Sequence, residues 1–281
     1  MPGTLFVVAT PIGNLEDITL RALRVLREVD LIAAEDTRHT AHLLAHFGIS
    51  TQTTSFHAHN TRSRIPALVA RLQAGESIAV VSDAGTPGIA DPGVELVQAC
   101  VAADIRVDAI PGPSAPLTAA LASGFPLQPL TILGFAPAKA TDRFAWLETV
   151  SSMPGTVTFF EAPHRVEDTL RDLGSALGER PIVVARELTK LHQEFLRGTA
   201  ADIIGHLTVA RGEFTVVVGP QSTAKRPSKP PSDEELLAEF GRMSESVASS
   251  RRAVVAAVAR KFSRPVREVY AAVERAKKSV R

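Results

Sequence analysis

Residues 82–93 read Ser-Asp-Ala-Gly-Thr-Pro-Gly-Ile-Ala-Asp-Pro-Gly and follow an apolar run at residues 77–81. These residue types suit ligand binding, because two glycines let a ligand approach the main chain and two prolines stiffen the loop. An ordinary connection is the alternative, but strand-to-helix connections usually take about 2–6 residues. We therefore expect a ligand site at this strand end, with Asp83 and Thr86 as polar contacts. Residues 89–93 are expected to begin the next helix rather than to contact the ligand.

Three further loops follow predicted strands and combine glycine or charged residues with polar side chains: residues 10–17, 35–38 and 111–115. In the first loop Gly13 permits close approach of the main chain, and Asn14 can both donate and accept hydrogen bonds. Asp17 is expected to cap the helix that follows it. In the third loop Gly112 exposes main-chain N–H groups, and Ser114 stands where a helix would begin.

The second of these loops places Glu35 and Asp36 next to Arg38. Two adjacent carboxylates are costly to bury without a role, and such groups are often functional. The same residues cost little if they cap the next helix. The sequence leaves both interpretations open.

Several common cofactor and metal motifs are absent from the sequence. No G-x-G-x-x-G follows the first predicted strand, and no G-x-x-x-x-G-K-[ST] occurs, so neither a dinucleotide nor a P-loop nucleotide is indicated. His57 and His59 are the only close pair of potential metal ligands in a plausible loop, and no cysteine or H-E-x-x-H helix accompanies them. We expect no metal site.

Composition and length indicate a soluble globular protein. The length of 281 residues predicts two domains. The 45% of hydrophobic and 22% of charged residues are typical of a soluble globular protein. Its apolar runs are too short to span a bilayer, and residues 1–10 resemble a first strand rather than a signal peptide. The single cysteine, Cys100, cannot form an intrachain disulfide, which favours a reducing cytoplasm. We expect a cytoplasmic protein without a membrane partner.

The net charge of +1 hides an asymmetry along the chain. Residues 249–281 contain ten Lys or Arg and two Glu, so their net charge is +8, whereas residues 1–248 sum to −7. This basic end indicates an anionic partner. A solvated helical surface is the alternative.

Apolar runs alternate with helical periodicity over the first 220 residues, which predicts an α/β fold whose first half holds a mostly parallel sheet. Strands are expected at residues 5–9, 31–34, 78–81, 107–110, 131–135, 156–161, 182–186 and 214–219. Helices are expected at residues 18–29, 40–47, 65–72, 94–101, 117–123, 142–149, 166–177 and 201–207.

We expect four parts: an N-terminal α/β domain at residues 1–123, a C-terminal α/β domain at 124–220, a linker at 221–232 and a basic helical module at 233–281. The linker contains three prolines and no apolar periodicity. Three short helices are expected in the module, at 233–242, 249–262 and 265–278. Their apolar stripes are Val254, Val258 and Phe262 in one helix, and Val266, Val269, Tyr270 and Val273 in the next.

Six motifs occur in a fixed order and together carry a resemblance that no one of them would carry alone. They are residues 9–19 (ATPIGNLEDIT), 33–38 (AAEDTR), 82–93, 110–115 (IPGPSA), 159–165 (FFEAPHR) and 185–190 (ARELTK). The chain closely resembles the bacterial methyltransferases of the tetrapyrrole methylase superfamily that modify the 2′-oxygen of a cytidine ribose in small-subunit (16S) ribosomal RNA. The resemblance covers essentially the whole chain, including the basic end.

The resemblance implies two α/β domains with an active-site cleft between them, a homodimer, and S-adenosylmethionine as cofactor. It maps the cofactor loops onto Pro11, Ile12, Gly13, Asp83, Ala84, Gly85, Thr86, Pro87, Ser114, Ala115, Glu161 and Ala162. Many members of the superfamily carry Gly-Pro-Gly-Asp in the first loop, whereas residues 11–14 here are Pro-Ile-Gly-Asn. This departure favours the RNA branch over the tetrapyrrole branch.

In the implied reaction a ribose 2′-oxygen attacks the sulfonium methyl group, so the protein must position the reactants and remove a proton. By residue type Glu35, Asp36 and His57 are candidates for the base. Arg38, Arg165, Arg186 and Lys190 could hold phosphates, and Asn14 and Asn60 could orient the ribose. The basic end would add RNA contacts from Arg251, Arg252, Arg260, Lys261, Arg264 and Arg267. Structural ion pairs or helix caps are the alternative role for each of these side chains.

Two alternative functions stay open. A tetrapyrrole methyltransferase would use the same scaffold with another acceptor. A nucleic-acid-binding protein could keep the cofactor fold without catalysis. A purely structural scaffold would explain neither the loops nor the charge asymmetry.

Overall fold

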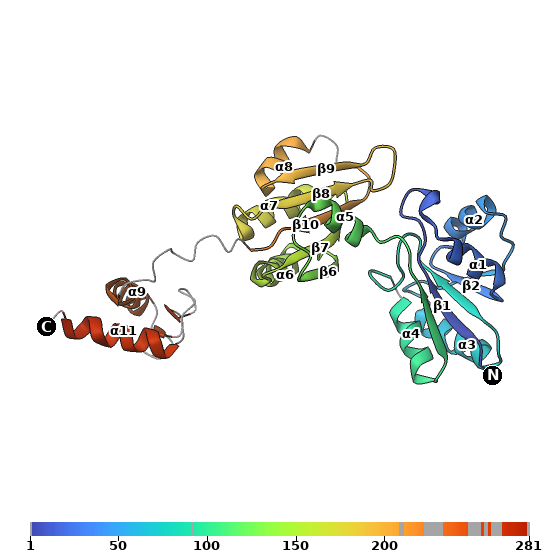
Figure 1. Ribbon diagram of the computed structural model, residues 1–281, viewed down its shortest axis with the longest axis horizontal. Coiled ribbons are helices and arrows are strands. Elements are labelled where there is room, and N and C mark those ends of the chain that lie inside the picture. Colours follow the sequence, from blue (N-terminus) through green and yellow to red (C-terminus); the bar gives the residue numbers. More distant parts are fainter. Residues whose placement is uncertain are drawn as a thin grey trace. The chain divides into compact units, whose positions relative to one another are not determined.

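The computed structural model of the chain describes residues 2–91, 93–207, 211–221, 233–246, 254–255, 258–259 and 266–279 (Figure 1). Contacts divide the chain into two compact units, residues 1–221 and residues 222–281. Apart from Gln221, the expected linker lies outside the described residues. No helix in the described part of the chain is long and apolar enough to cross a membrane.

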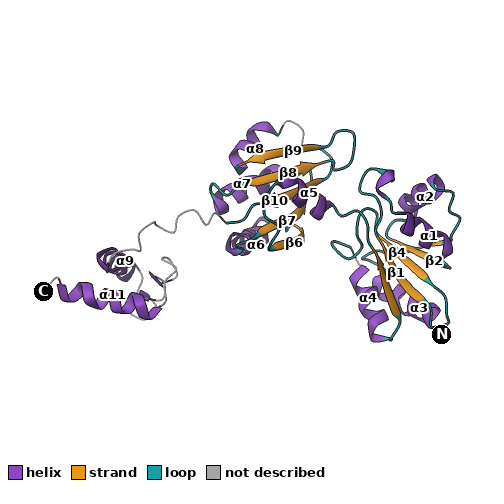
Figure 2. Cartoon of the chain, viewed as in Figure 1, coloured by secondary structure: helices purple, strands orange, loops and turns teal. Residues whose placement is uncertain are grey.

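The first sheet contains five parallel strands in the order β3-β2-β4-β1-β5. Figure 2 draws its strands in orange, with β1, β2 and β4 labelled. The strands are β1 (Thr4–Val8), β2 (Leu31–Ala34), β3 (Thr53–Ser55), β4 (Ile78–Val81) and β5 (Arg106–Ile110). The intervening helices are α1 (Leu20–Glu28), α2 (Thr37–His46), α3 (Thr61–Gln73) and α4 (Gly93–Ala102). Every residue of β2 and β4 is buried, as their unbroken apolar sequences predict.

Helices cover both faces of this sheet. Successive strand residues point to opposite sides, and since the central strands are apolar throughout, both faces need cover. Ile32 and Ala34 pack in one core with Leu26 of α1 and Leu44 of α2. Leu31 and Ala33 pack in a second core with residues of α3 and α4, namely Leu68, Leu72, Leu96 and Cys100. Figure 1 shows the two helix pairs on either side of the strands.

The first helix begins later than the sequence predicts. Thr19 is its N-cap, and the Thr19 hydroxyl accepts a 3.1 Å hydrogen bond from the main-chain N–H of Ala22. The expectation that Asp17 caps this helix is therefore wrong. Asp17 instead ends a short 3-10 helix, Leu15–Asp17, which delays the start of α1.

The second sheet is mixed and has the order β6-β7-β10-β8-β9. Its strands are β6 (Leu130–Phe135), β7 (Thr156–Glu161), β8 (Ile182–Arg186), β9 (Glu194–Gly198) and β10 (Phe214–Val218). Only β6 and β7 run parallel, and β10 lies antiparallel between β7 and β8. The helices are α5 (Ala115–Ser123), α6 (Ala140–Ser152), α7 (Val166–Leu177) and α8 (Ala200–His206).

Two strands, β3 and β9, are not predicted from the sequence, and both lie at the edge of a sheet. Strand β3 consists of Thr-Thr-Ser, and β9 has polar or glycine residues at both ends. Neither strand has a fully buried residue, so neither produces the apolar run that marks a central strand.

Helix α5 lies before residue 124, yet it packs on the second sheet. Its Ala119 is fully buried in a cluster with Val183, Ala185 and Val217. The proposed boundary at residue 124 stays a prediction, and this packing draws α5 toward the C-terminal domain.

The second unit has a core of its own. Helices α9 (Asp233–Ser246) and α11 (Val266–Ser279) contribute Leu236, Phe240, Val269, Ala272 and Val273, joined by Val254, Val255, Val258 and Ala259. The predicted stripe of the last helix is partly wrong, because Val266 and Tyr270 are each 49% exposed and Ala272 takes part instead. Phe262 lies outside the described residues.

Candidate active site

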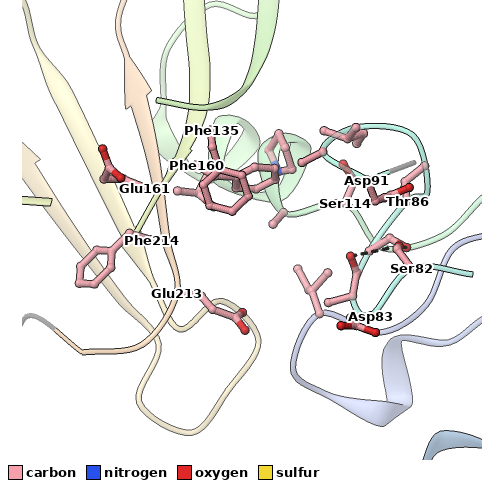
Figure 3. Close-up of a pocket in the computed structure, with 18 of the residues that line it drawn as sticks. Ser82, Asp83, Thr86, Asp91, Ser114, Phe135, Phe160, Glu161, Glu213 and Phe214 are labelled. Carbon is pink, nitrogen blue, oxygen red and sulfur yellow. Dashed lines mark hydrogen bonds between the residues drawn. The ribbon is translucent and has the colours of Figure 1, made fainter. Parts of the chain in front are cut away.

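A cavity of about 410 Å³ opens beside the loop after β4, within the first unit (Figure 3). Ligand sites commonly have volumes of roughly 300–1,000 Å³. Its lining combines the carboxyl ends of β2, β4 and β7 with the start of α5 and residues 212–215: Ile12, Glu35, Ser82, Asp83, Ala84, Gly85, Thr86, Ile89, Ala90, Asp91, Ser114, Ala115, Pro116, Phe135, Phe160, Glu161, Ala162, Pro163, Gly212, Glu213, Phe214 and Thr215. The cavity therefore joins residues from both sheets.

Two phenylalanines supply apolar surface to the cavity. Phe135 and Phe160 come from adjacent strands, and their ring centroids lie 5.2 Å apart. Phe214 also belongs to the lining, but its ring is turned away from the cavity in Figure 3 and packs in the core of the second sheet. Flat aromatic surface of this kind suits a heteroaromatic ring of a ligand. Aromatic residues in strands resemble ordinary core residues, so no sequence pattern marks them as ligand contacts.

The loop after β4 is held in place by the loops after β1 and β5. Thr10 and Gly85 exchange main-chain hydrogen bonds of 2.9 and 3.0 Å. Gly85 has a φ of +83°, which an L side chain rarely adopts. The Thr86 hydroxyl donates a 2.9 Å hydrogen bond to the carbonyl of Pro113. The predicted polar contact Thr86 thus lines the cavity, but its hydroxyl proton is directed at the main chain.

Asp91 has a larger place in the cavity than the sequence suggests. With Ile89 and Ala90 it lines the wall, and α4 begins only at Gly93. That residues 89–93 do not contact the ligand stays a prediction. The Asp91 carboxylate accepts hydrogen bonds from the main-chain N–H groups of Gly88 and Gly93, at 2.8 and 3.0 Å. Burial nevertheless raises the pKa of Asp91.

The adjacent acids Glu35 and Asp36 have different roles, so each of the two open interpretations fits one residue. Glu35 lines the cavity, and burial raises its pKa, with added repulsion from Asp83 and Asp91. Asp36 caps α2 by accepting a 2.8 Å hydrogen bond from the main-chain N–H of Arg38. Hydrogen bonds from the Arg38 side chain lower the pKa of Asp36.

Ser114 provides a test of whether a polar ligand fits this cavity. The residue is 6% exposed, lines the cavity and has a side-chain oxygen with no hydrogen-bond partner among the described residues. A buried hydroxyl without a partner is costly, which indicates that a ligand supplies one. The donor set therefore fits a cofactor with an apolar ring and several polar groups.

Glu161 is buried and already fully engaged. Its two oxygens accept hydrogen bonds from the Thr169 hydroxyl and from the main-chain N–H of Ala162, at 2.5 and 2.7 Å. Arg165 adds an ion pair at 2.8 Å. Glu161 thus fixes the end of β7, and a ligand would meet its neighbourhood rather than a free carboxylate.

The structure brings most of the expected cofactor residues together, although their role in binding stays a prediction. Those that line the cavity are Ile12, Asp83, Ala84, Gly85, Thr86, Ser114, Ala115, Glu161 and Ala162. Pro11, Gly13 and Pro87 lie outside its lining. An added Cβ on Gly13 would lie 2.5 Å from Lys190 Cγ and 2.8 Å from the Leu188 carbonyl, so this glycine permits close packing of two loops.

Of the expected bases, Glu35 alone lines the cavity, whereas Asp36 and His57 do not. Arg38, an expected phosphate contact at the reacting ribose, lies outside the lining as well. The main-chain N–H of His57 donates to Asn60 Oδ1 at 2.9 Å, and the His57 ring contacts that of His59. Its Nδ1 is buried and has no hydrogen-bond partner among the described residues. Within the described chain, no cluster of three or more His, Cys, Asp or Glu could hold a metal ion.

The expected RNA contacts in the first unit have partners within the protein. Asn14 caps the 3-10 helix, and Asn60 holds the Ser55 side chain and main chain. Arg165, Arg186 and Lys190 each pair with glutamates, at distances of 2.8 to 3.4 Å: Glu161 for the first, Glu194 for the second, and Glu187 with Glu213 for the third. Structural roles thus account for their positions.

The expected RNA contacts in the second unit are largely beyond description. Arg251, Arg252, Arg260, Lys261 and Arg264 lie outside the described residues. Arg267 belongs to α11, but its side chain is likewise outside the description. Their proposed role stays a prediction.

Comparison with known proteins agrees with this architecture. Residues 4–204 match the model of the tetrapyrrole (corrin/porphyrin) methylases. A protein from Streptococcus pyogenes serotype M1 named ribosomal RNA small subunit methyltransferase I is 48% identical over 218 residues, which cover 77% of this chain and 76% of the relative. A protein of the same name from Synechocystis sp. is 49% identical over 229 residues, covering 80% and 82%.

Solved structures show the same fold at low sequence identity. The methyltransferase CobJ matches with a TM-score of 0.60 and 22% identity, covering 79% of this chain and 96% of that one. Uroporphyrin-III C-methyltransferase from Thermus thermophilus, solved in complex with S-adenosylhomocysteine, matches with a TM-score of 0.55 and 17% identity, covering 77% and 97%. The chain belongs to the tetrapyrrole methylase family. Its curated relatives place it in the branch of that family named ribosomal RNA small subunit methyltransferase I.

Proposed function

We propose that the protein transfers a methyl group from S-adenosylmethionine to the ribose 2′-oxygen of a cytidine in small-subunit (16S) ribosomal RNA. The observation that carries the proposal is the cavity at the strand ends, whose wall holds the partnerless hydroxyl of Ser114 opposite aromatic surface. The relatives named for small-subunit ribosomal RNA methylation support the choice of acceptor.

Residues of both sheets would hold the cofactor. Phe135 and Phe160 would contact a flat ring, and the Ser114 hydroxyl and the main chain at Ala84–Gly85 would supply polar contacts. The carboxylates of Asp83 and Asp91 add negative charge to the same wall, which suits a cation. When bound, S-adenosylmethionine would supply a methyl group on an already activated sulfonium.

Glu35 is our candidate for the proton acceptor, because it is the only predicted base in the cavity wall. Its Oε2 accepts a 3.1 Å hydrogen bond from the main-chain N–H of Asp83, which fixes the direction of the carboxylate. Its raised pKa makes it a stronger base than an exposed glutamate. Positioning of the hydroxyl would supply the rest of the rate enhancement.

We also propose a homodimer in the cytoplasm. Leu117 and Leu121 lie one turn apart on α5 and are 45% and 71% exposed in the single chain. An interface between copies would bury such an apolar pair. Sedimentation analysis of the full chain at several concentrations tests the dimer, and a monomer at every concentration would contradict it.

Methyl transfer itself is tested with labelled S-adenosylmethionine and small ribosomal subunits from cells that lack this protein. We expect one labelled ribose, mapped by the resistance of its 3′ linkage to alkali. A parallel incubation with a corrinoid precursor tests the tetrapyrrole alternative. Label in the precursor and not in RNA would overturn the proposal, as would cofactor binding without transfer to any RNA.

A further inference from the structure

One stretch of the first unit has a charge pattern unlike the rest. Residues 1–221 contain 17 Lys or Arg and 23 Asp or Glu, so the unit is acidic as a whole. Residues 37–75 contain no Asp or Glu, yet they hold four arginines and five of the eight histidines of the chain. A stretch that has no acidic residue and several arginines presents a local surface suited to anions.

The strand register places the start of this stretch and the middle of it at the carboxyl ends of β2 and β3, next to the end of β4 where the cavity lies. Ala34 of β2 pairs with Ser55 of β3 on one side and with Val81 of β4 on the other. The chain therefore leaves all three strands side by side, toward α2, α3 and the loop that carries Asp83. Arg38, His39 and His42 lie in the first two turns of α2, and Arg62 and Arg64 lie in the first turn of α3.

A second, smaller hollow lies next to the cavity on this surface. It has a volume of about 140 Å³, and its lining includes His39 and His42 of α2 together with Pro11. Ser82 and Asp83 line both this hollow and the larger cavity. A substrate seated on the histidines would thus lie beside Asp83.

The cationic side chains on this surface are available. The side chains of Arg62 and Arg64 are exposed and make no hydrogen bond or ion pair with the described residues, and His39 and His42 are exposed as well. By contrast Arg165 and Lys190, the earlier phosphate candidates, are mostly buried and paired with glutamates. The cofactor is itself cationic at its sulfonium, so an arginine surface would serve the second substrate.

We propose that Arg62 and Arg64, together with His39 and His42, hold phosphates of the RNA strand on either side of the nucleotide that is methylated. Arginine suits phosphate because its planar donors match two oxygens at once. Neutral histidine still offers one N–H donor. The inference rests on the proposed function, and it assigns the substrate surface of that same site.

The test replaces both arginines, as Arg62→Ala/Arg64→Ala, in the full-length protein. We expect the KM for small ribosomal subunits to rise roughly tenfold or more, equivalent to about 1.4 kcal/mol or more. The slope of log affinity against log salt for a ribosomal RNA fragment should decrease by about one to two units. The affinity for S-adenosylmethionine should stay unchanged, which also shows that the variant is folded.

Arg106→Ala is the matched control, because Arg106 is exposed at the first residue of β5, at the opposite edge of the same sheet. It should leave KM and salt slope unchanged. Arg62→Lys/Arg64→Lys should recover most of the affinity, since the charge remains. An unchanged KM and slope in the alanine variant would overturn the inference while wild-type methylation still upheld the proposed function. If the alanine variant lost binding to anionic lipid vesicles and kept wild-type binding to RNA, the inference would be overturned as well.

Discussion

Glu35 and Asp83 support each other's strand ends through reciprocal hydrogen bonds. Glu35 Oε2 accepts from the main-chain N–H of Asp83 at 3.1 Å, and Asp83 Oδ1 accepts from the main-chain N–H of Asp36 at 2.9 Å. The two carboxylates therefore join the ends of β2 and β4 at the floor of the cavity. This arrangement keeps two negative groups close together, and their repulsion helps to raise the pKa of Glu35.

Asp83→Ala is expected to abolish binding of S-adenosylmethionine without unfolding the protein. It removes a carboxylate from the cavity wall and leaves the N–H of Asp36 without its partner, which costs about 1–3 kcal/mol if that group stays buried. Titration calorimetry and thermal unfolding measure the two effects. Asp83→Asn is the control that keeps an acceptor for Asp36 and removes only the charge. Unchanged cofactor affinity in Asp83→Ala would mean that Asp83 only shapes the loop.

Glu35→Gln should stabilise the protein at neutral pH. Burial raises the pKa of Glu35 above its ordinary value of 4.5, so the folded state binds this proton more tightly than the unfolded state. Stability therefore falls as pH rises above that value, and the variant escapes the loss. We expect a higher Tm than wild type at about pH 7 and an equal Tm near about pH 4.

Asp36→Asn supplies a control of opposite sign for the pH series. The side chain of Arg38 lowers the pKa of Asp36, so this carboxylate stabilises the folded state above its ordinary pKa of 3.8, and the effect is lost as pH falls. In methyl-transfer assays Glu35→Gln should lower kcat by roughly 10²–10⁴ if Glu35 is the base. If the Tm of Glu35→Gln ran parallel to that of wild type across the pH range, the raised pKa of Glu35 would be contradicted. An unchanged kcat in Glu35→Gln would exclude Glu35 as the base.

Ser114→Ala should weaken cofactor binding without weakening the fold. The Ser114 hydroxyl has no partner among the described residues, so its removal loses no hydrogen bond of the free protein. We expect the Kd for S-adenosylmethionine to rise about 3- to 10-fold, the worth of one neutral hydrogen bond. Thr158→Val is the matched control, because the Thr158 hydroxyl is also buried without a described partner but lies outside the cavity lining. An equal Kd for Ser114→Ala and wild type would remove Ser114 from the cofactor site.

Gly13→Ala should destabilise the protein by about 1–3 kcal/mol, the usual range for overpacking. The new Cβ would meet Lys190 Cγ at 2.5 Å, the Leu188 carbonyl at 2.8 Å and Thr189 Oγ1 at 2.9 Å. Chemical denaturation measures the change. Gly205→Ala in α8 is the control, since nothing lies within 4 Å of its added Cβ and alanine favours a helix. Equal effects in the two variants would show that the loops do not pack as described.

Deleting residues 233–281 should weaken RNA binding and leave cofactor binding nearly intact. The second unit has its own core, and the cavity is lined only by residues of the first unit. Removal of a basic segment should also reduce the salt dependence of RNA affinity. Calorimetry with S-adenosylmethionine and filter binding with a ribosomal RNA fragment separate the two ligands. A large loss of cofactor affinity would contradict this independence.

The central strands and the order of the loops that form the site can be predicted from the sequence. Runs such as residues 31–34 and 78–81 are apolar throughout, so they can only be strands buried on both faces or short core helices, and their length decides for strands. Parallel strands end at one edge, so the loops after them had to meet there. This physical rule predicts that Glu35, Asp83 and Ser114 lie close together.

Whether a polar group lines the cavity or stabilises the fold depends on contacts between residues that are distant in the chain. Glu35 and Asp36 are neighbours in sequence, but strand register directs one into the cavity and leaves the other as a helix cap. Lys190 has the residue type of a phosphate contact, but the chain before β10 places Glu213 beside it. Phe160 has the residue type of a core residue, but the pairing of β6 with β7 places it on the cavity wall. Such pairings join residues far apart in the chain, so their energies depend on packing that local sequence patterns do not specify.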